Sequence, residues 1–458
     1  MLSLETVSNW ALRRGFVFPS SEIYGGFSAV YDMGPLGVEL QNALKRLWWR
    51  EMVDTRPDIV GLDAQILMHP RVWDASGHTA AFTDPMVDCL SCKKRFRADH
   101  LYEEVTKENV DDLNIEQLTA AFKEKKIVCP SCGGELTEPR AFNLLVGAEL
   151  GVIEGEKRQV WLRGETAQGI YVNANRVAEA MRLQPPFGIA QIGKAFRNEI
   201  TPKDFLFRVR EFEQMEMQYL CRNATQASEQ FAFWRARRKQ YLEELVGLSA
   251  EHLRYHEHSD AERAHYAQAA EDIQFHFPFG WKELEGIHNR GVWDLSRHSE
   301  YSGQDLQFFD QTANEKYIPS IVETSGGVGR LTLALMCQVL EEETLEGAET
   351  RMVARFKPVL APVQVAVLPL SKKEQLSAKA REVFTAVVAE TGLRVQYDET
   401  QSIGKRYRRQ DEIGTPLCVT VDFDSLEDGA VTVRDRDSMQ QERVKIAELP
   451  AFLQMRCA

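Results

Sequence analysis

Residues 187 to 220 constrain the fold more than any other stretch, because they read as two long β-strands joined by a segment that favours a turn. The turn segment, Ile200 to Phe205, contains Thr-Pro and Lys-Asp. We therefore predict a long antiparallel hairpin. Strand side chains alternate between two faces, so each arm presents polar and aromatic residues along one face. These are Arg197 and Glu199 on the first arm, and Arg208, Arg210, Phe212, Gln214 and Glu216 on the second.

Such a surface suits a nucleotide. Guanidinium groups match phosphate oxygens, the ring of Phe212 can stack on a base, and a carboxylate can accept a hydrogen bond from an exocyclic amine. The alternative is a charged, solvated hairpin, because cross-strand Arg/Glu pairs also stabilise ordinary sheets. The hairpin alone leaves both interpretations open.

The order of residues in the hairpin favours the first interpretation. Phe196-Arg197-Asn198-Glu199, a loop, and then Arg208 with Phe212 four residues later resemble the second signature motif of class II aminoacyl-tRNA synthetases. The resemblance implies that Arg197 holds the α-phosphate of ATP and that Glu199 meets the adenine amine. It also implies that Arg208 reaches the distal phosphate and that Phe212 stacks on adenine.

Residues 318 to 338 read as a buried strand, a glycine-rich turn and an apolar helix. Gly326, Gly327 and Gly329 allow close approach of the backbone to a ligand, and Arg330 lies in the first helical turn, which favours an anion. The pattern is neither GxxxxGK[ST] nor GxGxxG. It resembles the third class II motif, whose arginine binds the γ-phosphate.

Residues 35 to 48 form an amphipathic pattern that Pro35 opens, and an extended run follows from Ile59 to Met68. The apolar stripe of the helix is either ordinary core or an intersubunit core. Helix, strand and proline together resemble the first class II motif, which builds the dimer interface. The strings EIYGG, GPLGVEL and RVWDASGH resemble glycyl-tRNA synthetases of the homodimeric type, so the resemblance implies a homodimer.

Four of the eight cysteines form two CxxC pairs, Cys89 with Cys92 and Cys129 with Cys132. Two such knuckles can place four thiolates tetrahedrally around Zn²⁺, so we predict a structural zinc site. The alternative is a set of reduced cysteines in a site that has lost its metal, because the gap between the pairs is longer than in compact zinc ribbons. The other four cysteines are scattered and indicate no disulfide framework.

Glu165 and Thr166 lie at a turn between a predicted strand and a predicted helix, where Thr166 could simply cap the helix. In the family this acid receives the ammonium of the bound amino acid. Glu323 is expected to add negative charge there, and Ser325 to fill the space beside the α-carbon. Glu283 and Glu285, predicted to share one strand face, could hold the Mg²⁺ that accompanies ATP.

The resemblance implies that Arg197, Arg208 and Arg330 are catalytic. It implies an ATP site formed by Arg197, Asn198, Glu199, Phe207, Arg208, Val209, Arg210, Glu211, Phe212, Glu283, Leu284, Gly327, Val328, Gly329 and Arg330. It implies a glycine site formed by Arg97, Glu165, Phe212, Glu213, Gln214, Met215, Glu216, Glu323, Thr324, Ser325, Gly326 and Gly327.

Two further regions carry basic residues. The charged stretch from 223 to about 275 reads as helical, and its cluster Arg235, Arg237, Arg238 and Lys239 is either a solvated helix face or a contact for the tRNA acceptor arm. From residue 358 onward, strands alternate with helices, the last helix beginning at Arg443, which predicts a small α/β domain with a mixed sheet. It resembles an anticodon-binding domain, with Lys405, Arg406, Arg408 and Arg409 as candidates for phosphate contacts.

These boundaries predict an α+β, multidomain fold, in which the family implies an antiparallel sheet flanked by helices. The expected divisions are catalytic residues 1–85 with the dimer motif, a zinc-binding insertion at 86–158, catalytic residues 159–222, a helical insertion at 223–278, catalytic residues 279–350, and an anticodon-binding domain at 358–458.

The net charge of −13 argues against a generally basic nucleic-acid coat, although tRNA needs only a local basic face. No stretch is apolar enough to span a membrane and no export signal is evident, so we expect a cytoplasmic protein.

The resemblance implies ATP-dependent attachment of glycine to tRNA(Gly) through a glycyl-adenylate. The alternatives are a non-catalytic paralogue that binds nucleic acid as an accessory subunit, and a class II enzyme for another amino acid.

Overall fold

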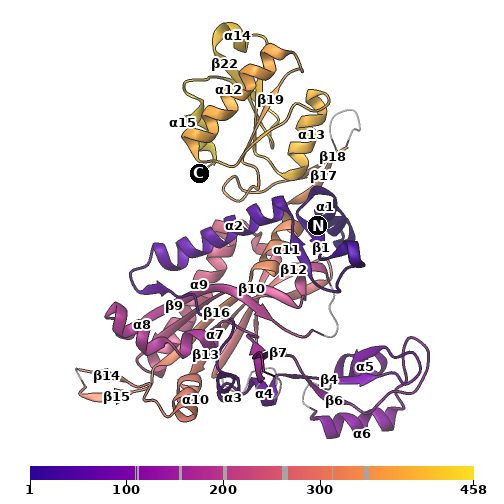
Figure 1. Ribbon diagram of the computed structural model, residues 1–458, viewed down its shortest axis with the longest axis vertical. Coiled ribbons are helices and arrows are strands. Elements are labelled where there is room, and N and C mark those ends of the chain that lie inside the picture. The colour runs from indigo at the N-terminus through magenta and orange to yellow at the C-terminus, as the bar shows by residue number, and fades with distance from the viewer. Residues whose placement is uncertain are drawn as a thin grey trace.

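The computed structural model describes residues 1–108, 110, 113–153, 157–199, 204–259, 267–311, 313–344 and 350–457. It is a mixed α/β protein of several sheets (Figure 1). The C-terminal domain lies at one end of the molecule, the large central sheet lies in the middle, and the cysteine-containing insertion lies at the other end (Figure 1).

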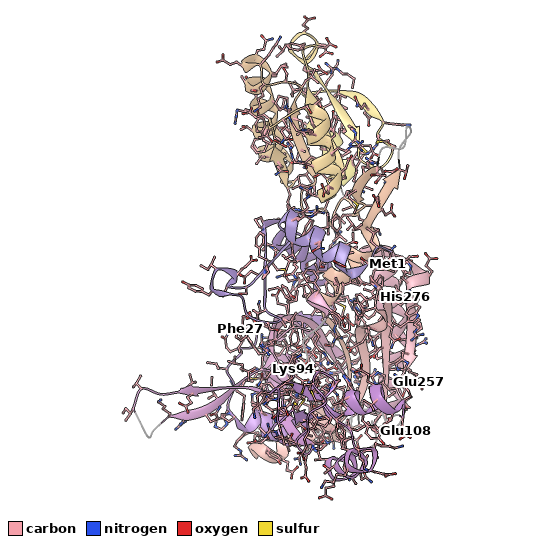
Figure 2. The ribbon with its side chains drawn as sticks, turned by 90° about the vertical axis from the view of Figure 1, so that its right-hand side faces the viewer. Met1, Phe27, Lys94, Glu108, Glu257 and His276 are labelled. Atoms are coloured by element: carbon pink, nitrogen blue, oxygen red, sulfur yellow. The ribbon has the colours of Figure 1, made fainter. Side chains whose placement is uncertain are left out.

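The central sheet has seven strands in the order β11-β12-β13-β16-β10-β9-β3. All neighbouring strands are antiparallel except β3 and β9, which are parallel. The strands are β3 (Ile59–Gly61), β9 (Phe187–Phe196), β10 (Glu211–Cys221), β11 (Leu253–Glu257), β12 (Ala269–Phe277), β13 (Gly280–Gly291) and β16 (Ser320–Gly327). Figure 2 shows the β11–β12 edge of this sheet, where Glu257 and His276 lie.

The predicted hairpin is present as β9 and β10, which pair from Phe187 with Leu220 to Phe196 with Glu211. Arg197, Glu199 and Arg208 do not lie within the arms, contrary to the prediction, but in the connection between them. The extended backbone stops there because Asp204 and Phe205 have positive φ values of 62° and 56°, and the short helix η3 (Phe205–Phe207) follows. Most of the expected turn, residues 200–203, lies outside the described residues.

One face of the central sheet packs on the main hydrophobic core, to which α2 (Pro35–Trp49), α9 (Ala224–Gln240) and α11 (Val328–Val339) contribute. The apolar stripe of α2 belongs to this core, because Leu40, Ala43, Leu44 and Trp48 are buried in it. Helices α7 (Ala167–Tyr171), α8 (Ala174–Met181) and α10 (Trp293–Ser302) pack through a second cluster against β9, β10 and β13.

The prediction of a helical stretch from 223 to 275 is correct only in its first half. Helix α9 continues into η4 (Tyr241–Val246), and the chain then forms η5 (Ala250–His252) and strands β11 and β12. In β12 the alternating residues Ile273, Phe275 and Phe277 are buried in the core, so the strand period outweighs the charged composition that suggested a helix.

The cysteine-containing insertion has a separate small core and a three-stranded sheet in the order β5-β4-β6. Its elements are β4 (Thr83–Asp88), β5 (Arg95–Arg97), α5 (Ala98–Thr106), α6 (Ile115–Lys125) and β6 (Arg140–Asn143), and the ribbon β7 (Val146–Leu150) with β8 (Arg158–Leu162) follows. The remaining elements before the C-terminal domain are α1 (Leu4–Arg14), β1 (Val17–Pro19), η1 (Glu22–Tyr24), β2 (Tyr31–Met33), η2 (Arg50–Asp54), α3 (Arg71–Ala75), α4 (His78–Ala81), β14 (Phe308–Asp310), β15 (Glu315–Tyr317), β17 (Leu340–Thr344) and β18 (Thr350–Ala354).

The C-terminal domain has the predicted mixed sheet, in the order β20-β19-β21-β22-β23. Its elements are β19 (Val365–Pro369), α12 (Glu374–Thr391), β20 (Val395–Tyr397), α13 (Ile403–Ile413), β21 (Leu417–Val421), α14 (Ser425–Asp428), β22 (Ala430–Asp435), β23 (Gln441–Lys445) and α15 (Leu449–Cys457). The expected helix from Arg443 is wrong in its start, because Arg443 pairs with Thr432 in the ladder of β22 and β23.

Buried charges join this domain to the rest of the chain. Arg351 of β18 donates to Asp411 of α13 over 2.7 Å, and Arg434 of β22 donates to the same carboxylate over 2.8 Å. The indole of Trp10 donates to the backbone carbonyl of Glu412 over 3.0 Å. Because these charged groups are buried, breaking one of the pairs would leave an unpaired charge away from water and would destabilise the joint.

Candidate nucleotide and amino-acid site

A pocket opens on the face of the central sheet that is turned away from the main core. It is lined by the connection between β9 and β10, the strands β10, β13 and β16, and the first turn of α11. The lining residues are Arg197, Glu199, Leu206, Phe207, Arg208, Val209, Phe212, Gln214, Glu283, Ser325, Gly327, Gly329 and Arg330.

Aromatic rings and backbone hold the first arginine of this pocket. The guanidinium of Arg197 lies 5.2 Å from the ring centre of Phe82 and 5.4 Å from that of Phe212, and its Nε donates to the Gly164 carbonyl over 3.1 Å. The remaining nitrogens can face a ligand. Arg208 lies 3.6 Å from the buried carboxylate of Glu199, which limits its orientation. The arrangement therefore fixes two cations beside one flat ring, which suits phosphate and base together.

Arg330 projects from the first turn of α11 into the same pocket. Its Nε donates to the Phe207 carbonyl over 3.3 Å, its guanidinium lies 4.4 Å from the Phe207 ring centre, and a nitrogen lies 2.9 Å from the carboxylate of Glu283. The positive charge of Arg330 lowers the pKa of Glu283, whose carboxylate remains partly exposed. The helix N-terminus adds favourable potential for an anion at this position.

Glu283 and Glu285 do not share a face of β13, contrary to the sequence prediction. The pairing of β12 with β13 shifts here, so that Ile273 pairs with Glu285 and Gln274 pairs with Glu283. Ile273 and Gln274 are adjacent in β12, so their side chains point to opposite faces of the sheet. Their partners on β13 also point to opposite faces, because Leu284 between them is the extra residue of a β-bulge. Glu285 is buried in an ion pair with Arg238 of α9, and Glu283 alone reaches the pocket.

Three carboxylates lie together beside the nucleotide pocket. Glu216 is on β10, Glu323 is on β16, and Glu165 is at the turn before α7. Gln218 donates to Glu323 over 2.7 Å and to Glu216 over 3.3 Å, and Thr166 donates to Glu216. Thr166 therefore does not cap α7, since its side chain makes no cap hydrogen bond and is used on Glu216 instead.

Ion pairs at contact distance join two of these carboxylates, Glu323 and Glu165, to basic side chains. His288 lies 2.7 Å and Arg290 3.0 Å from the oxygens of Glu323, and His78 lies 3.5 Å from Glu165, which also accepts from Gln168 over 2.7 Å. Burial opposes ionisation of Glu323, but Arg290 and His288 outweigh it and lower its pKa to about 2.

The other two carboxyls shift in opposite directions. Burial opposes ionisation of Glu165, but His78, Arg290 and the hydrogen bond from Gln168 together outweigh it and lower the pKa of Glu165. Burial, together with the charges of Glu323 and Glu165, raises the pKa of Glu216 well above its usual value.

Gln214 links this carboxylate cluster to the nucleotide pocket. Its carbonyl oxygen accepts from the Thr166 amide over 3.1 Å, and its nitrogen donates to the Ser325 hydroxyl over 3.5 Å. Both Gln214 and Ser325 also line the nucleotide pocket. A small ligand at the carboxylates would therefore lie next to a phosphate-bearing ligand, which is the geometry needed to join the two.

Several residues of the predicted sites lie elsewhere. Within the described part of the chain, Asn198, Arg210, Glu211, Leu284 and Val328 do not line the nucleotide pocket. Arg210 instead donates to the Ser28 and Glu199 carbonyls and stacks on Phe27, and the side chain of Leu284 is buried in the core.

A second group of predicted site residues lies on the face of the sheet opposite the pocket, because strand residues alternate between the two faces. They are Glu213, Met215, Thr324 and Gly326, which alternate with Gln214, Glu216, Glu323 and Ser325. Glu213 pairs there with Lys45 of α2 over 3.1 Å, and Met215 lies in the main core. Arg97 lies in the insertion, paired with Asp84 over 3.0 Å.

Sequence reasoning missed the groups that neutralise and position the carboxylates. They are His78, Gln168, Gln218, His288 and Arg290. Sequence reasoning also missed Phe82, whose ring packs against Arg197. The only sequence signal was the alternation of His288 and Arg290 along a predicted strand, which places both on one face. It did not indicate which acids they would meet.

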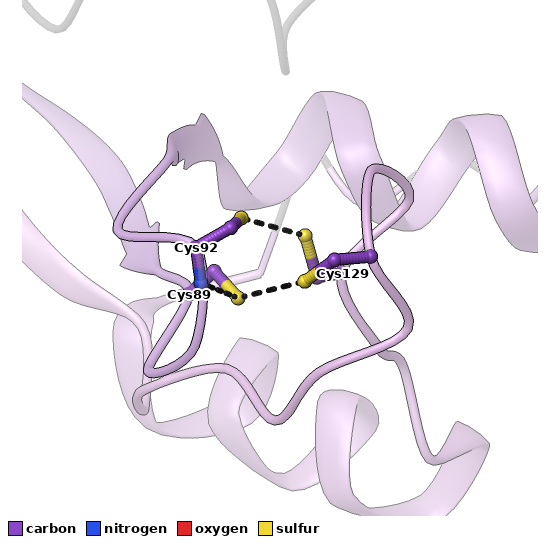
Figure 3. A group of neighbouring side chains, drawn as sticks. Cys89, Cys92 and Cys129 are labelled. Carbon is purple, nitrogen blue, oxygen red and sulfur yellow. Dashed lines mark hydrogen bonds between the residues drawn. The ribbon is translucent and has the colours of Figure 1, made fainter.

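The four CxxC cysteines form a cluster in the insertion (Figure 3). All four sulfurs lie within 4.8 Å of one another, with Cys89 and Cys132 at 3.5 Å and Cys92 and Cys129 at 3.6 Å. Tetrahedral Zn²⁺ with bonds of about 2.3 Å requires sulfurs about 3.8 Å apart. The donor set and the spacing therefore fit zinc.

The predicted basic contacts are mostly engaged within the protein. Arg406 is buried and donates to the Thr400 carbonyl over 3.2 Å and to two other backbone carbonyls. The prediction that it contacts phosphate is therefore wrong. Arg409 pairs with Asp398, and Lys405 is exposed. In the cluster on α9, the four cations pair with Glu271, Glu51, Glu285 and Glu243. That cluster is therefore not a freely solvated face.

None of the helices in the described ranges combines the length and the apolar composition needed to cross a membrane. Residues 364–456 match the family model described as an anticodon binding domain. The chain is 51% identical to the glycine–tRNA ligase of Bacillus anthracis, with 99% of each protein covered. It is 50% identical to the glycine–tRNA ligase of Geobacillus kaustophilus, covering 100% of this chain and 99% of that protein. It is 51% identical to the glycine–tRNA ligase of Treponema denticola, covering 98% and 96%.

Proposed function

The chain belongs to the glycine–tRNA ligase family, and on that basis we propose that it attaches glycine to tRNA(Gly) with ATP, through a glycyl-adenylate. The observation that carries the proposal is the convergence of Arg197, Arg208 and Arg330 on one pocket beside a buried carboxylate cluster. The cations suit the triphosphate, and the carboxylates suit the ammonium of an amino acid.

In the proposed reaction, the glycine carboxylate attacks the α-phosphorus of ATP, and pyrophosphate leaves. The ribose hydroxyl of the terminal tRNA adenosine then takes the glycyl group. Arg197, Arg208 and Arg330 offset the negative charge that develops in line, so no nucleophilic side chain is required. Glu283 is the acid of β13 that can hold Mg²⁺, which would neutralise phosphate charge when bound with ATP.

A direct test is ATP–pyrophosphate exchange with each standard amino acid, followed by charging of tRNA(Gly) by the purified protein. We expect exchange with glycine and transfer to tRNA(Gly). Exchange with a different amino acid would favour the class II enzyme of other specificity. No exchange with any amino acid, together with tRNA binding, would favour the non-catalytic paralogue, although the three arginines of the pocket argue against it.

We also propose the class II architecture and a homodimer. An antiparallel sheet with a nucleotide pocket on one face agrees with the class II pattern and not with a parallel nucleotide-binding sheet. β3 is an edge strand of that sheet, and α2 precedes it. We propose this edge as the dimer interface, residues 358–458 as an anticodon-binding domain, and the cytoplasm as the location of the protein.

We propose that Cys89, Cys92, Cys129 and Cys132 hold one structural Zn²⁺ per chain. Metal analysis of protein purified without chelator should give about one zinc per chain, and Cys129→Ser should lose it. The insertion should then become sensitive to protease, because its small core alone supplies little stability. Ser131→Ala, in the same knuckle, is the control and should retain zinc. Absence of zinc together with four titratable thiols would contradict the proposal.

We propose that Ser325 closes the space beside the α-carbon of glycine, next to Gln214. Overpacking a rigid site costs about 1 to 3 kcal/mol, so Ser325→Gly should lower discrimination against alanine by roughly 10- to 100-fold and affect glycine less. Exchange kinetics with both amino acids measure this. Ser325→Ala retains the β-carbon and should retain most of the discrimination. If Ser325→Gly discriminates against alanine as well as the wild type does, other atoms exclude the alanine methyl group.

A further inference from the structure

The carboxylate cluster contains more negative charge than its cationic partners can neutralise. Glu323 is paired with Arg290 and His288, and Arg290 is shared with Asp294, whose two oxygens it meets at 2.8 and 2.9 Å. Glu165 has His78 at 3.5 Å. The third carboxyl, Glu216, is 2% exposed, accepts its hydrogen bonds from neutral groups, and is influenced by the positive charge of Arg290, which it must share with Glu323, Glu165 and Asp294.

The hydrogen-bond partners of Glu216 are both neutral. Thr166 donates its hydroxyl, and Gln218 donates its amide over 3.3 Å. Gln218 is itself fixed, because its carbonyl oxygen accepts from Tyr171 over 2.8 Å. A hydroxyl can both donate and accept, so the contact with Thr166 persists whether Glu216 is a carboxylate or a carboxylic acid.

The charged and titratable groups that face Glu216 come from several elements packed around it. Those that interact electrostatically with Glu216 are Glu323 on β16, Glu165 before α7, Tyr171 on α7, Arg290 on β13 and Arg163 after β8. The neighbours of Glu216 are in turn surrounded by His288 on β13, His78 on α4, and Asp294 and His298 on α10. Arg163 is directed to the backbone carbonyls of Lys194 and Ala64, both at 2.5 Å, and does not pair with Glu216.

We propose that Glu216 is protonated while the pocket is empty and that the ammonium of glycine displaces this proton to solvent. A third buried carboxylate with two like charges nearby and only neutral donors is costly, and a proton removes that cost. An entering ammonium supplies one positive charge at the same place. Glu216 then ionises, the proton passes to buffer, and the bound ammonium replaces it. The inference rests on the proposed function, because that function assigns glycine to this cluster.

The exchange of a proton for an ammonium has a measurable consequence. Proton release on binding makes glycine affinity rise with pH by up to about tenfold per pH unit, over the range in which Glu216 is protonated when free and ionised when bound. Above that range, the affinity becomes independent of pH. At low pH, Glu216 stays protonated when glycine binds, so the affinity for glycine is lower. An ionised Glu216 therefore favours a ligand that carries a full positive charge.

Calorimetric titration of the full chain with glycine tests the proposal in buffers of different ionisation enthalpy. The observed enthalpy should vary with the buffer, with a slope corresponding to about one proton released per glycine bound. Glu216→Gln keeps the shape and the hydrogen bond from Thr166 but has no proton to lose. Its buffer dependence and its pH dependence should disappear. Glu271→Gln, on the opposite face of the same sheet and paired with Arg235, should behave as the wild type.

Infrared difference spectra of the wild type provide a measurement that does not depend on the variant binding glycine. Adding glycine should remove a carboxylic acid band, and this loss should be absent in Glu216→Gln. The proposal is overturned if the wild-type enthalpy is the same in all buffers, or if proton release persists in a folded Glu216→Gln protein. Persistent release would assign the proton to His288 or to glycine itself. Failure of the proposed function would appear differently, as absence of glycine-dependent exchange.

Discussion

Replacing Arg197 with alanine is expected to lower glycine-dependent ATP–pyrophosphate exchange by about 100- to 1,000-fold, as expected for loss of one preorganised donor to developing charge. The side chain is anchored by the Gly164 carbonyl and by the rings of Phe82 and Phe212, so its free nitrogens are already directed into the pocket. Exchange kinetics at saturating glycine measure the effect, with circular dichroism to establish folding.

Lys194→Ala is the matched control for this prediction. Lys194 is a cation of β9 close to Arg197 in sequence, but it is exposed and pairs with Glu211 at the surface, so its removal should change exchange little. Arg330→Ala should give a loss similar to that of Arg197→Ala from the other side of the pocket. Near wild-type exchange in both folded arginine variants would show that the nucleotide does not bind at this pocket.

Replacing Arg238 with methionine is expected to destabilise the protein by about 3 to 5 kcal/mol, because it leaves Glu285 buried without a partner. Both side chains lie in the interior between α9 and β13. The midpoint of urea unfolding, followed by tryptophan fluorescence, measures the loss. Lys239→Met, one residue later on the helix, should cost much less, because Lys239 and its partner Glu243 are both partly exposed.

The double variant Arg238→Met with Glu285→Leu separates two explanations. If the cost arises from the orphaned carboxylate, replacing both partners with apolar residues should recover most of the stability. If the double variant is less stable than Arg238→Met, the ion pair contributes net stability beyond avoiding an unpaired charge. Neither residue belongs to the proposed nucleotide site, so any loss of exchange should follow the loss of folded protein.

The parts of the fold that the sequence predicted well are those with a strong local period. β9 and β10 alternate over ten and eleven residues, and α11 follows a glycine-rich turn with an apolar face. In the C-terminal domain, strands of buried valines alternate with helices. These elements are buried along most of their length, and their runs of apolar residues are encoded locally in the chain.

The parts that failed depend on partners that are distant in sequence. The β-bulge at Leu284 is fixed by the pairing of β13 with β12, and it reverses the side on which Glu285 lies. Arg406 looks like a surface cation on a basic helix, but backbone carbonyls satisfy it in the interior. Similarly, the pKa of Glu216 is raised by burial and by the carboxylates of Glu323 and Glu165, which come from distant parts of the sequence. A linear pattern contains none of this information.

The joint around Asp411 fixes the C-terminal domain against the rest of the chain. Arg351 and Arg434 approach this carboxylate from the two sides of the boundary, all three groups are buried, and Trp10 adds a bond to the next residue. A hinge requires groups that exchange partners at low cost, and these cannot. With the proposed function, the distance between the C-terminal domain and the nucleotide pocket would stay fixed. The protein would select RNA by overall length and bend, and the RNA would supply the flexibility that the protein lacks.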